Sequence, residues 1–453
     1  MQTEMTALAA TRFGLGAALD QTTPDGPDAL IAQLGAAKLS PDEDALPLSE
    51  RNALMHRQFE ARQLRKKNPG EAGELLDAVT DLYRKTVDAD AKRLMTRALG
   101  NSPAMLERLA WFWADHFTVA AEGRRRTILT YDLVETAIRP NLIKRFPKML
   151  KSVVKHPAML VYLDQVRSIG PASRVGKRRN AGLNENLARE VLELHTVGVN
   201  GGYTQKDVRE FAELLTGLSL DKGNFVFRPE MAEPGPEEVL GKRYGSDKQA
   251  ALRDVDRALT DLAMRPETAR HLSRKLIQHF VTLRPEDSYV EAVADAYLES
   301  NGRLMAMYRA MISDPRAWVL PLEKAKMPLH YMVSSMRALG VTPQEVRDLK
   351  RGTFNGQILS PMAAMGQPLL RPVGPDGWSE EPSDWITPSG LAARVQWANG
   401  AVQTRGEGLD PRQFLERTLG TLASPVLRLS VARAETRHEG LTLVLASPEF
   451  NRC

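Results

Sequence analysis

Cysteine is almost absent from this chain of 453 residues, which holds only one, Cys453. A single cysteine excludes a disulfide within the chain and any zinc or iron–sulfur site built from several thiolates. No apolar run approaches the ~20 residues that a membrane-spanning helix needs. The first twenty residues also lack the basic start, long apolar core and cleavage site of a signal peptide. We therefore expect a cytoplasmic protein with no membrane span.

The charge balance has little bias toward either sign, with a net charge of +5 and a pI of about 9.2. This balance permits an anionic partner without requiring one. The basic runs at residues 65–67 and 124–126 are scattered, and no stripe of aromatic and arginine side chains accompanies them. Nucleic-acid binding is therefore disfavoured. With 43% hydrophobic and 26% charged residues, the composition is that of a soluble globular protein.

Helical periodicity extends over most of the sequence, interrupted by stretches rich in Pro and Gly. The expected fold class is mainly α, a large multi-helix array of orthogonal or bundle-like packing with long Pro/Gly-rich loops. Residues 222–244 lose the helical period and predict a short β-hairpin or an irregular excursion. The segment 366–387 is too rich in Pro and Gly for regular structure, and its tryptophans predict a long ordered loop.

The stretch NENLAREVLELHTVGVNGGYTQKDVREFAELLTG, residues 184–217, concentrates polar side chains among regularly spaced apolar positions. Its first half predicts a helix over 184–197, followed by a Gly-rich turn. Thr204 caps a second helix, and Asp207 three residues later completes a capping box. The pattern therefore predicts a helical hairpin.

The first helix of this hairpin carries Glu190, Glu193 and His195, side chains that acid–base and metal chemistry use. At about 100° per residue the two carboxylates are neighbours and can share a metal or a proton. His195 lies on the apolar side, nearly half a turn from Glu190, and does not join them easily. The alternatives are a salt bridge between Arg189 and Glu193 and a core histidine bonded to a carbonyl.

A second histidine lies on an apolar helix stripe in the window 103–119, PAMLERLAWFWADHFTV. There His116 is on the apolar stripe, and Asp115 faces away from it. Histidines 116 and 195 can converge across a helix interface, as ligands do in helical bundles. With Glu190 they form the predicted metal set, and a divalent transition metal is the cofactor it suggests. The alternative is that both are satisfied core residues.

Two functions from different classes follow from this pattern. The first is an enzyme in which Glu190, Glu193, His195 and His116 perform metal-assisted or general acid/base catalysis. Its substrate would be held by Asn184, Asn186, Arg189, Tyr203 and Gln205. The second is a non-catalytic helical scaffold, or a maturation or export partner of another protein. In that case the histidines bond backbone carbonyls, the helix forms ordinary salt bridges, and an exposed apolar patch lies elsewhere.

The stretch LNENLAREVLELHTVGVNGGYTQKDVREFAELLTG closely resembles the signature of the bacterial domain-of-unknown-function 1800 family. Further matches, in the same order, are RFGLGA (12–17), WADHFTV (113–119), MLVYLD (159–164), RKLIQHFV (274–281) and GQPLLRPVGPDGW (366–378). The resemblance implies one helical unit over 1–453 and no particular reaction. Its expected subregions are an N-terminal helical layer (1–100), central helices with the site (101–220), the excursion (221–247) and a C-terminal helical region (248–453).

The sequence departs from the family pattern within the excursion. Ala232 and Glu233 stand where the family carries a His-Asp pair, Glu237 replaces a lysine, and Leu218 replaces a tryptophan after LTG. If the His-Asp pair helps to bind a metal, this chain has lost a ligand. The resemblance also implies a co-encoded partner of the domain-of-unknown-function 1501 family. Because many relatives are exported, a periplasmic location in complex is the alternative to the cytoplasm.

Overall fold

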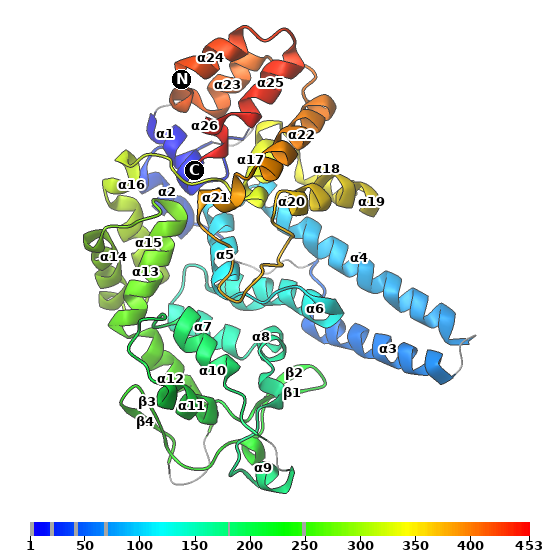
Figure 1. Ribbon diagram of the computed structural model, residues 1–453, viewed down its shortest axis with the longest axis vertical. Coiled ribbons are helices and arrows are strands. Elements are labelled where there is room, and N and C mark those ends of the chain that lie inside the picture. Colours follow the sequence, from blue (N-terminus) through cyan, green and yellow to red (C-terminus); the bar gives the residue numbers. More distant parts are fainter. Residues whose placement is uncertain (1–3, 19–21, 40–43, 68–70, 180–181, 247–250) are drawn as a thin grey trace.

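The computed structural model describes residues 4–18, 22–39, 44–67, 71–179, 182–246 and 251–453, and its elements are almost all helices (Figure 1). The mainly α prediction is confirmed. In the described residues before 180 the α-helices are α1 (Glu4–Leu8), α2 (Pro27–Gly35), α3 (Leu48–Lys67), α4 (Glu71–Leu99), α5 (Ala104–His116), α6 (Gly123–Leu133), α7 (Phe146–Val154), α8 (Pro157–Tyr162) and α9 (Arg174–Arg179).

The described central part continues with α10 (Asn186–Glu190), α11 (Gln205–Leu214), α12 (Leu252–Ala263), α13 (Pro266–Phe280), α14 (Asp287–Glu299), α15 (Leu304–Ser313), α16 (Arg316–Val319) and α17 (Pro328–Ala338). The C-terminal part holds α18 (Pro343–Asp348), α19 (Arg351–Phe354), α20 (Ser360–Ala364), α21 (Pro382–Trp385), α22 (Pro388–Arg405), α23 (Pro411–Thr418), α24 (Pro425–Ala432), α25 (Arg437–Ala446) and α26 (Pro448–Asn451).

Wider and tighter helical turns join several of these helices. The π-helical segments are η1 (Ala9–Phe13), η2 (Val134–Ile138), η5 (Val191–His195) and η7 (Asn355–Leu359). The 3₁₀ segments are η3 (Arg139–Asn141), η4 (Gln165–Arg167), η6 (Pro229–Met231) and η8 (Gly420–Leu422). Short π-helical insertions often mark functional sites, and η5 lies inside the predicted site.

The excursion after α11 contains two hairpins where the sequence predicted one. Strand β1 (Leu218–Asp221) pairs antiparallel with β2 (Asn224–Phe227), and β3 (Glu237–Val239) pairs with β4 (Lys242–Tyr244). Both two-residue turns, Lys222-Gly223 and Leu240-Gly241, have positive φ at both positions. This is the type I′ geometry that matches the twist of paired strands.

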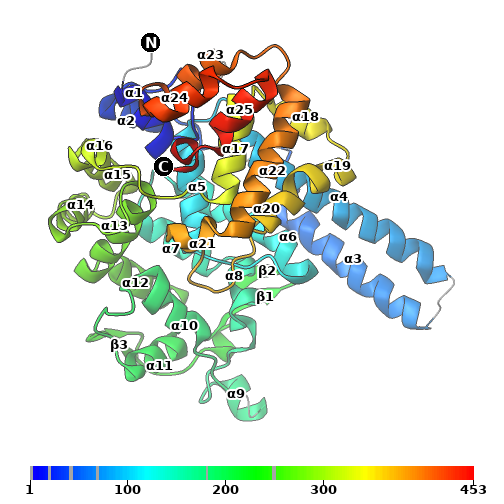
Figure 2. The ribbon, with the colours of Figure 1, turned by 45° about the horizontal axis from the view of Figure 1, so that its top comes forward.

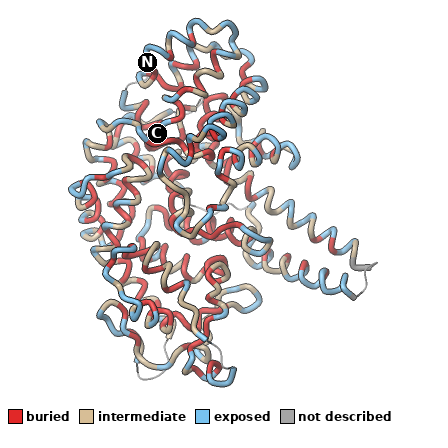
Figure 3. Tube along the Cα trace, in the orientation of Figure 1, coloured by how far each residue is buried: buried red, intermediate tan, exposed pale blue. Residues whose placement is uncertain are grey.

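Helices α3 and α4 pair along their length and project from the body as an arm (Figures 1 and 2). The outer part of the arm is mostly exposed, whereas α5 and α17 in the body are mostly buried (Figure 3). The apolar positions of α4 near its C-terminal end, such as Met95 and Ala98, are buried against the body. The pairing of two long amphipathic helices thus stabilises the arm beyond the core.

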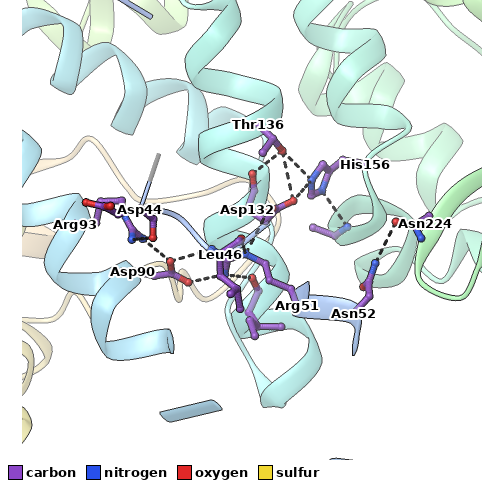
Figure 4. Close-up of polar contacts among 12 residues, drawn as sticks. Asp44, Leu46, Arg51, Asn52, Asp90, Arg93, Asp132, Thr136, His156 and Asn224 are labelled. Atoms are coloured by element: carbon purple, nitrogen blue, oxygen red, sulfur yellow. Dashed lines mark hydrogen bonds and ion pairs between the residues drawn. The ribbon is translucent and has the colours of Figure 1, made fainter. Parts of the chain in front are cut away.

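A buried ionic network fixes the base of the arm (Figure 4). Arg51 of α3 donates to both carboxylate oxygens of Asp90, at 2.6 and 2.9 Å, and lies 3.5 Å from Asp132. His156 Nε2 lies 2.9 Å from Asp132, while its Nδ1 accepts the N–H of Ala158. The proton of the ring is therefore on Nε2 and directed at Asp132. This histidine holds helices together and is not free to act as a base.

Two clusters of buried apolar side chains form the interior, and α5 lies between them. Trp113 is fully buried in the first cluster, which extends through α6–α8 and α11–α15, whereas Trp111 packs against the second cluster around α17 and α22. The segment between α20 and α21 crosses the centre of the molecule beside α5 (Figures 1 and 2). Its Trp378 packs on Trp385 at a ring distance of 5.8 Å. Within the range predicted as a loop, Pro382–Trp385 form the short helix α21.

Within the described residues, no helix has both the length and the apolar character that crossing a bilayer requires.

Candidate functional site

The predicted helical hairpin is present, with α10 and η5 forming its first helix and α11 its second. Thr204 accepts the N–H of Asp207, whose carboxylate accepts the N–H of Thr204 in return, so the capping box is complete. Gly198 has φ +85°, and a Cβ at this position would lie 2.9 Å from Nδ1 of His271. The glycine therefore lets the turn approach α13 closely.

Arg189, Tyr203 and Gln205, three of the side chains predicted to bind substrate, form hydrogen bonds within the hairpin. Arg189 donates to Gln205 at 2.9 Å and lies 3.3 Å from Glu185 and 3.6 Å from Glu193. The Tyr203 hydroxyl donates to Glu193 at 2.6 Å. These bonds hold the hairpin closed, as the salt-bridge alternative predicts.

The two asparagines at the start of the hairpin have local roles. The Oδ1 atom of Asn184 accepts the backbone N–H of Asn186 at 2.9 Å, which satisfies one of the free donors at the start of α10. The amide of Asn184 donates to the Asp164 carbonyl at 3.5 Å. These bonds orient the entry into α10.

The structure brings His116 and His195 together, with ring centroids 5.9 Å apart, and adds His271 at 6.2 Å from His116. His116 Nε2 bonds the carbonyl of His195, and His271 Nε2 bonds the carbonyl of Leu194. Burial lowers the pKa of His195 to about 3 and that of His271 to about 4, and it also lowers the pKa of His116. All three rings are therefore neutral at pH 7.

Within the described residues, one group of three acidic or imidazole side chains has its ligand atoms within 4.8 Å of one another, namely Glu210, Glu213 and Glu237. This group lies on α11 and β3 and does not include His116, Glu190 or His195. The metal-binding role of those three residues stays a prediction.

Glu190 lies within electrostatic range of Asp376 in the segment that crosses α5. Burial raises its pKa to about 7, and the charges of Glu193 and Asp376 contribute to the increase. Asp376 belongs to the PVGPDGW motif, almost two hundred residues later in the chain. A carboxyl group with a pKa near neutrality is suited to donate and accept protons at physiological pH.

Helix α13 contributes a row of ionisable side chains to the same region. His271, Lys275 and His279 are spaced four residues apart and share one face of the helix. The adjacent face, with Leu272, Leu276 and other apolar residues, is buried in the core. Burial lowers the pKa of Lys275, although Asp115, Glu380 and Asp376 partly offset this effect.

The crossing segment, residues 366–381, docks on α5 through the carboxylate of Asp115. Both oxygens of Asp115 accept the backbone N–H of Trp378, at 2.9 and 3.2 Å. Gly377 has φ +89°, and a Cβ there would lie 2.6 Å from the Asp115 carboxylate. Burial raises the pKa of Asp115 to about 7 against the opposing charge of Lys275. Asp115 is thus partly protonated near neutral pH.

The same segment fixes a histidine–carboxylate pair. Nδ1 of His279 donates to Glu380 at 2.7 Å, and the ammonium of Lys324 donates to the other oxygen of Glu380. Burial opposes the negative charge of Glu380, but Lys324 and His279 outweigh it and hold the pKa below its usual range. Nε2 of His279 makes no hydrogen bond to any described residue. The ring is therefore oriented with one nitrogen available.

Asp115, His279, Lys324 and Glu380 line one cavity of about 80 Å³ between α5, α13 and the crossing segment. The rest of its wall is largely apolar and includes Leu133, Val134, Leu329, Leu369, Leu370 and Trp378. A mostly apolar cavity with a few convergent polar groups of shifted pKa is the usual form of a small-molecule site.

Sequence reasoning missed Asp115, Lys275, His279 and Glu380. One signal was present for part of this set, because a His-x₃-Lys-x₃-His spacing puts three ionisable groups on one face of a helix. For Asp115 and Glu380 the sequence contains no such signal, since their partners lie far away along the chain.

A family model described as "Protein of unknown function (DUF1800)" matches residues 8–452. No curated protein and no solved structure matches the chain. The match extends over nearly the whole sequence and confirms the resemblance found in the motifs. The chain therefore belongs to the DUF1800 family of proteins of unknown function.

Proposed function

We propose that the protein is a general acid–base enzyme whose active site is the cavity between α5, α13 and residues 366–381. In this proposal His279 is the base and Asp115 is the acid. The observation that carries it is the 2.7 Å bond from His279 Nδ1 to Glu380, which leaves Nε2 without a partner in a cavity. A base must present an unbonded nitrogen to the substrate, and a carboxylate behind the ring fixes its orientation.

The protonation states support these two roles. Burial lowers the pKa of His279, so its ring is neutral at pH 7 and accepts a proton at Nε2. Because the pKa of Asp115 is about 7, a fraction of the protein molecules at pH 7 carries a protonated Asp115, which can donate its proton to the substrate. The charge of Glu380 stabilises the imidazolium that forms after proton transfer, and Lys324 holds Glu380 in position.

The hairpin contributes Glu190 to the same proposal. Its carboxyl group, with a pKa of about 7, is within electrostatic range of Asp376 on the crossing segment. We assign Glu190 a second proton-transfer role, separate from that of His279. In the metal-assisted form of the proposal, His116, His195 and Glu190 hold a divalent transition metal. Elemental analysis of purified protein and its Glu190→Ala and His195→Ala variants tests that form.

The test of the acid–base proposal is incubation of purified protein with a bacterial metabolite extract, followed by untargeted mass spectrometry. We expect the wild type to change at least one metabolite that His279→Gln and Asp115→Asn leave unchanged. His56→Gln is the matched control, because His56 is 71% exposed on α3, outside the residues that line the cavity. Equal metabolite changes with the wild type and His279→Gln would contradict the proposal.

A non-catalytic role as a binding partner is the second candidate, and the arm favours it. Phe59, Leu64, Leu75 and Leu82 on α3 and α4 are between 40% and 61% exposed, the apolar surface that this alternative predicts. The partner to test is the co-encoded protein of the domain-of-unknown-function 1501 family. Co-purification that Phe59→Ser abolishes and His56→Gln preserves would support this role.

A further inference from the structure

A second cavity, which we name the α22 groove, lies between α22 and the segment that holds α18 and α20 (Figure 2). Its volume is about 680 Å³, and none of the described residues that line it also lines the cavity beside His279. The lining side chains that are buried are all apolar, namely Met336, Leu339, Val346 and Ile358. An apolar groove of this volume has the form of a small-molecule site.

The charges in the groove compensate each other. Among the described residues that line it, only Glu345 and Arg405 are ionisable, and the Arg405 guanidinium donates to the Glu345 carboxylate. The other oxygen of this carboxylate accepts the backbone N–H of Thr342. Because the two opposite charges are paired, neither attracts an ion strongly, and the groove favours a neutral ligand.

Three primary amides lie at the rim of the groove. The side chains of Gln357, Gln396 and Gln403 are exposed, and none of them forms a hydrogen bond with a described residue. A primary amide offers donors and an acceptor side by side, so it pairs with the edge of a heteroaromatic ring, as glutamine does with adenine. These amides can therefore orient a neutral ligand whose edge carries both donors and acceptors.

Trp397 gives the groove a fixed aromatic surface. Its Nε1 atom donates to the backbone carbonyl of Gln357 at 2.8 Å, and its ring packs edge to face against Tyr331 at a ring distance of 5.9 Å. The indole is therefore held in place before a ligand binds, so stacking a second ring on it costs little side-chain entropy.

Two glycines leave room along the walls of the groove. Gly400 lies inside α22 and Gly356 inside η7, and a Cβ at either position would meet no neighbouring side chain or segment within 4 Å. Neither glycine is among the described residues with a positive φ. Since glycine destabilises a helix interior relative to alanine, packing and backbone conformation do not account for these two. Their missing side chains allow a flat ring to approach the helix backbone.

The volume of the groove sets the size of its ligand. A cavity of ~150 Å³ takes benzene, so one of about 680 Å³ takes roughly 27 non-hydrogen atoms at the same packing. This is the size of three fused rings that carry a short polar chain.

We infer that the α22 groove is a binding site for a neutral, planar heteroaromatic molecule of this size. The ring stacks on Trp397 between the two glycines, and its edge bonds the three glutamine amides. The inference goes beyond the proposed acid–base function and is independent of it, because the described linings of the groove and of the cavity beside His279 have no residue in common.

Riboflavin is the probe, because it is neutral, has a planar three-ring system with N–H and C=O groups along one edge, and is of about the inferred size. Calorimetric titration of the whole protein measures its affinity and stoichiometry, and quenching of the flavin fluorescence reports stacking on a tryptophan. Monolaurin, a neutral molecule with an alkyl chain and no ring, is titrated in the same way. We expect saturable binding of one riboflavin per chain and about tenfold weaker binding of monolaurin.

Gly400→Leu fills part of the groove without disturbing its walls, because the new side chain meets open space and leucine favours a helix more than glycine does. We expect it to weaken riboflavin binding about tenfold and to melt no lower than the wild type. Gly73→Leu is the matched control, because Gly73 also lies inside a helix, α4, with open space around a Cβ, and is outside the groove. Gln396→Met removes one amide, and we expect an affinity about fivefold lower.

Three results would overturn the inference. They are the absence of saturable riboflavin binding, tighter binding of monolaurin than of riboflavin, and equal riboflavin affinities of the wild type and Gly400→Leu. The acid–base function is tested separately, since we expect His279→Gln to bind riboflavin as the wild type does. Gly400→Leu should likewise retain any metabolite change that depends on His279.

Discussion

Asp115→Asn provides the sharpest test of the electrostatics of the site, because the pKa of this carboxyl moves from 3.8 to about 7. The folded protein holds the proton up to about pH 7, whereas the unfolded chain releases it near pH 4. Between these values the folded state binds more protons, so the free energy of unfolding falls as the pH rises. The loss is complete above pH 7, where both states are ionised. Asparagine does not titrate, and its Oδ1 still accepts the Trp378 N–H.

The magnitude follows from the two pKa values. Each tenfold change in proton affinity is worth ~1.4 kcal/mol, so a pKa that rises from 3.8 to about 7 corresponds to ~4 kcal/mol. Asp115 is partly accessible, and solvent reduces this to ~2–4 kcal/mol. The free energy of unfolding of Asp115→Asn, relative to that of the wild type, should therefore increase by ~2–4 kcal/mol as the pH rises from 4 to 8.

Urea denaturation of the wild type and Asp115→Asn at intervals from pH 4 to pH 8 measures this difference. Subtracting the two profiles removes the contributions of the other acids that both proteins share. Asp295→Asn, which changes an exposed carboxylate on α14, is the control and should follow the wild type at every pH. If the free energy of unfolding of Asp115→Asn changes with pH in the same way as that of the wild type, Asp115 is not protonated near neutral pH. Its role as the acid is then refuted.

Two further predictions concern the frame around the site. Arg51→Met removes the cation that Asp90 and Asp132 share, although Arg93 still pairs with Asp90, so we expect a loss of ~3 kcal/mol in urea denaturation; a loss below ~1 kcal/mol, the level of a surface pair, would show that the network adds little. Gly198→Ala puts a Cβ 2.9 Å from His271 at φ +85°, and we expect a loss of ~1–3 kcal/mol seen as a lower melting temperature. An unchanged melting temperature would mean that the turn relaxes away from α13.

The parts of the fold that depend on neighbours in sequence were predictable. The hairpin between 184 and 217, with its capping box at Thr204, rests on local hydrogen bonds and on spacing. Helix α4 likewise begins and ends where the apolar period does. In contrast, the two β-hairpins are joined by Lys-Gly and Leu-Gly turns, which lack the Asn or Asp that signals a type I′ turn.

The candidate site was only partly predictable, because its chemistry depends on contacts between distant segments. Asp115 faces away from the apolar stripe of α5, and from the sequence this side looks solvated. The structure covers it with a segment 263 residues later, which binds its carboxylate. His279 is similarly defined by Glu380, 101 residues away. The proximity of His116 and His195 was predicted, and so was the alternative of a histidine bonded to a backbone carbonyl, the bond that Nε2 of His116 forms. Nδ1 of His195 has no hydrogen-bond partner among the described residues.

The crossing segment also has a consequence for the order of events in the cell. Asp115 and Trp378 are separated by 263 residues, which a ribosome adds in roughly 10–50 s. During that interval α5 has already been made, while the part of the cavity wall that contains Glu380 does not yet exist. Contacts of such long range also form late in folding, because loop closure precedes them. Each nascent chain therefore remains without a complete site until its last quarter has been synthesised and has docked.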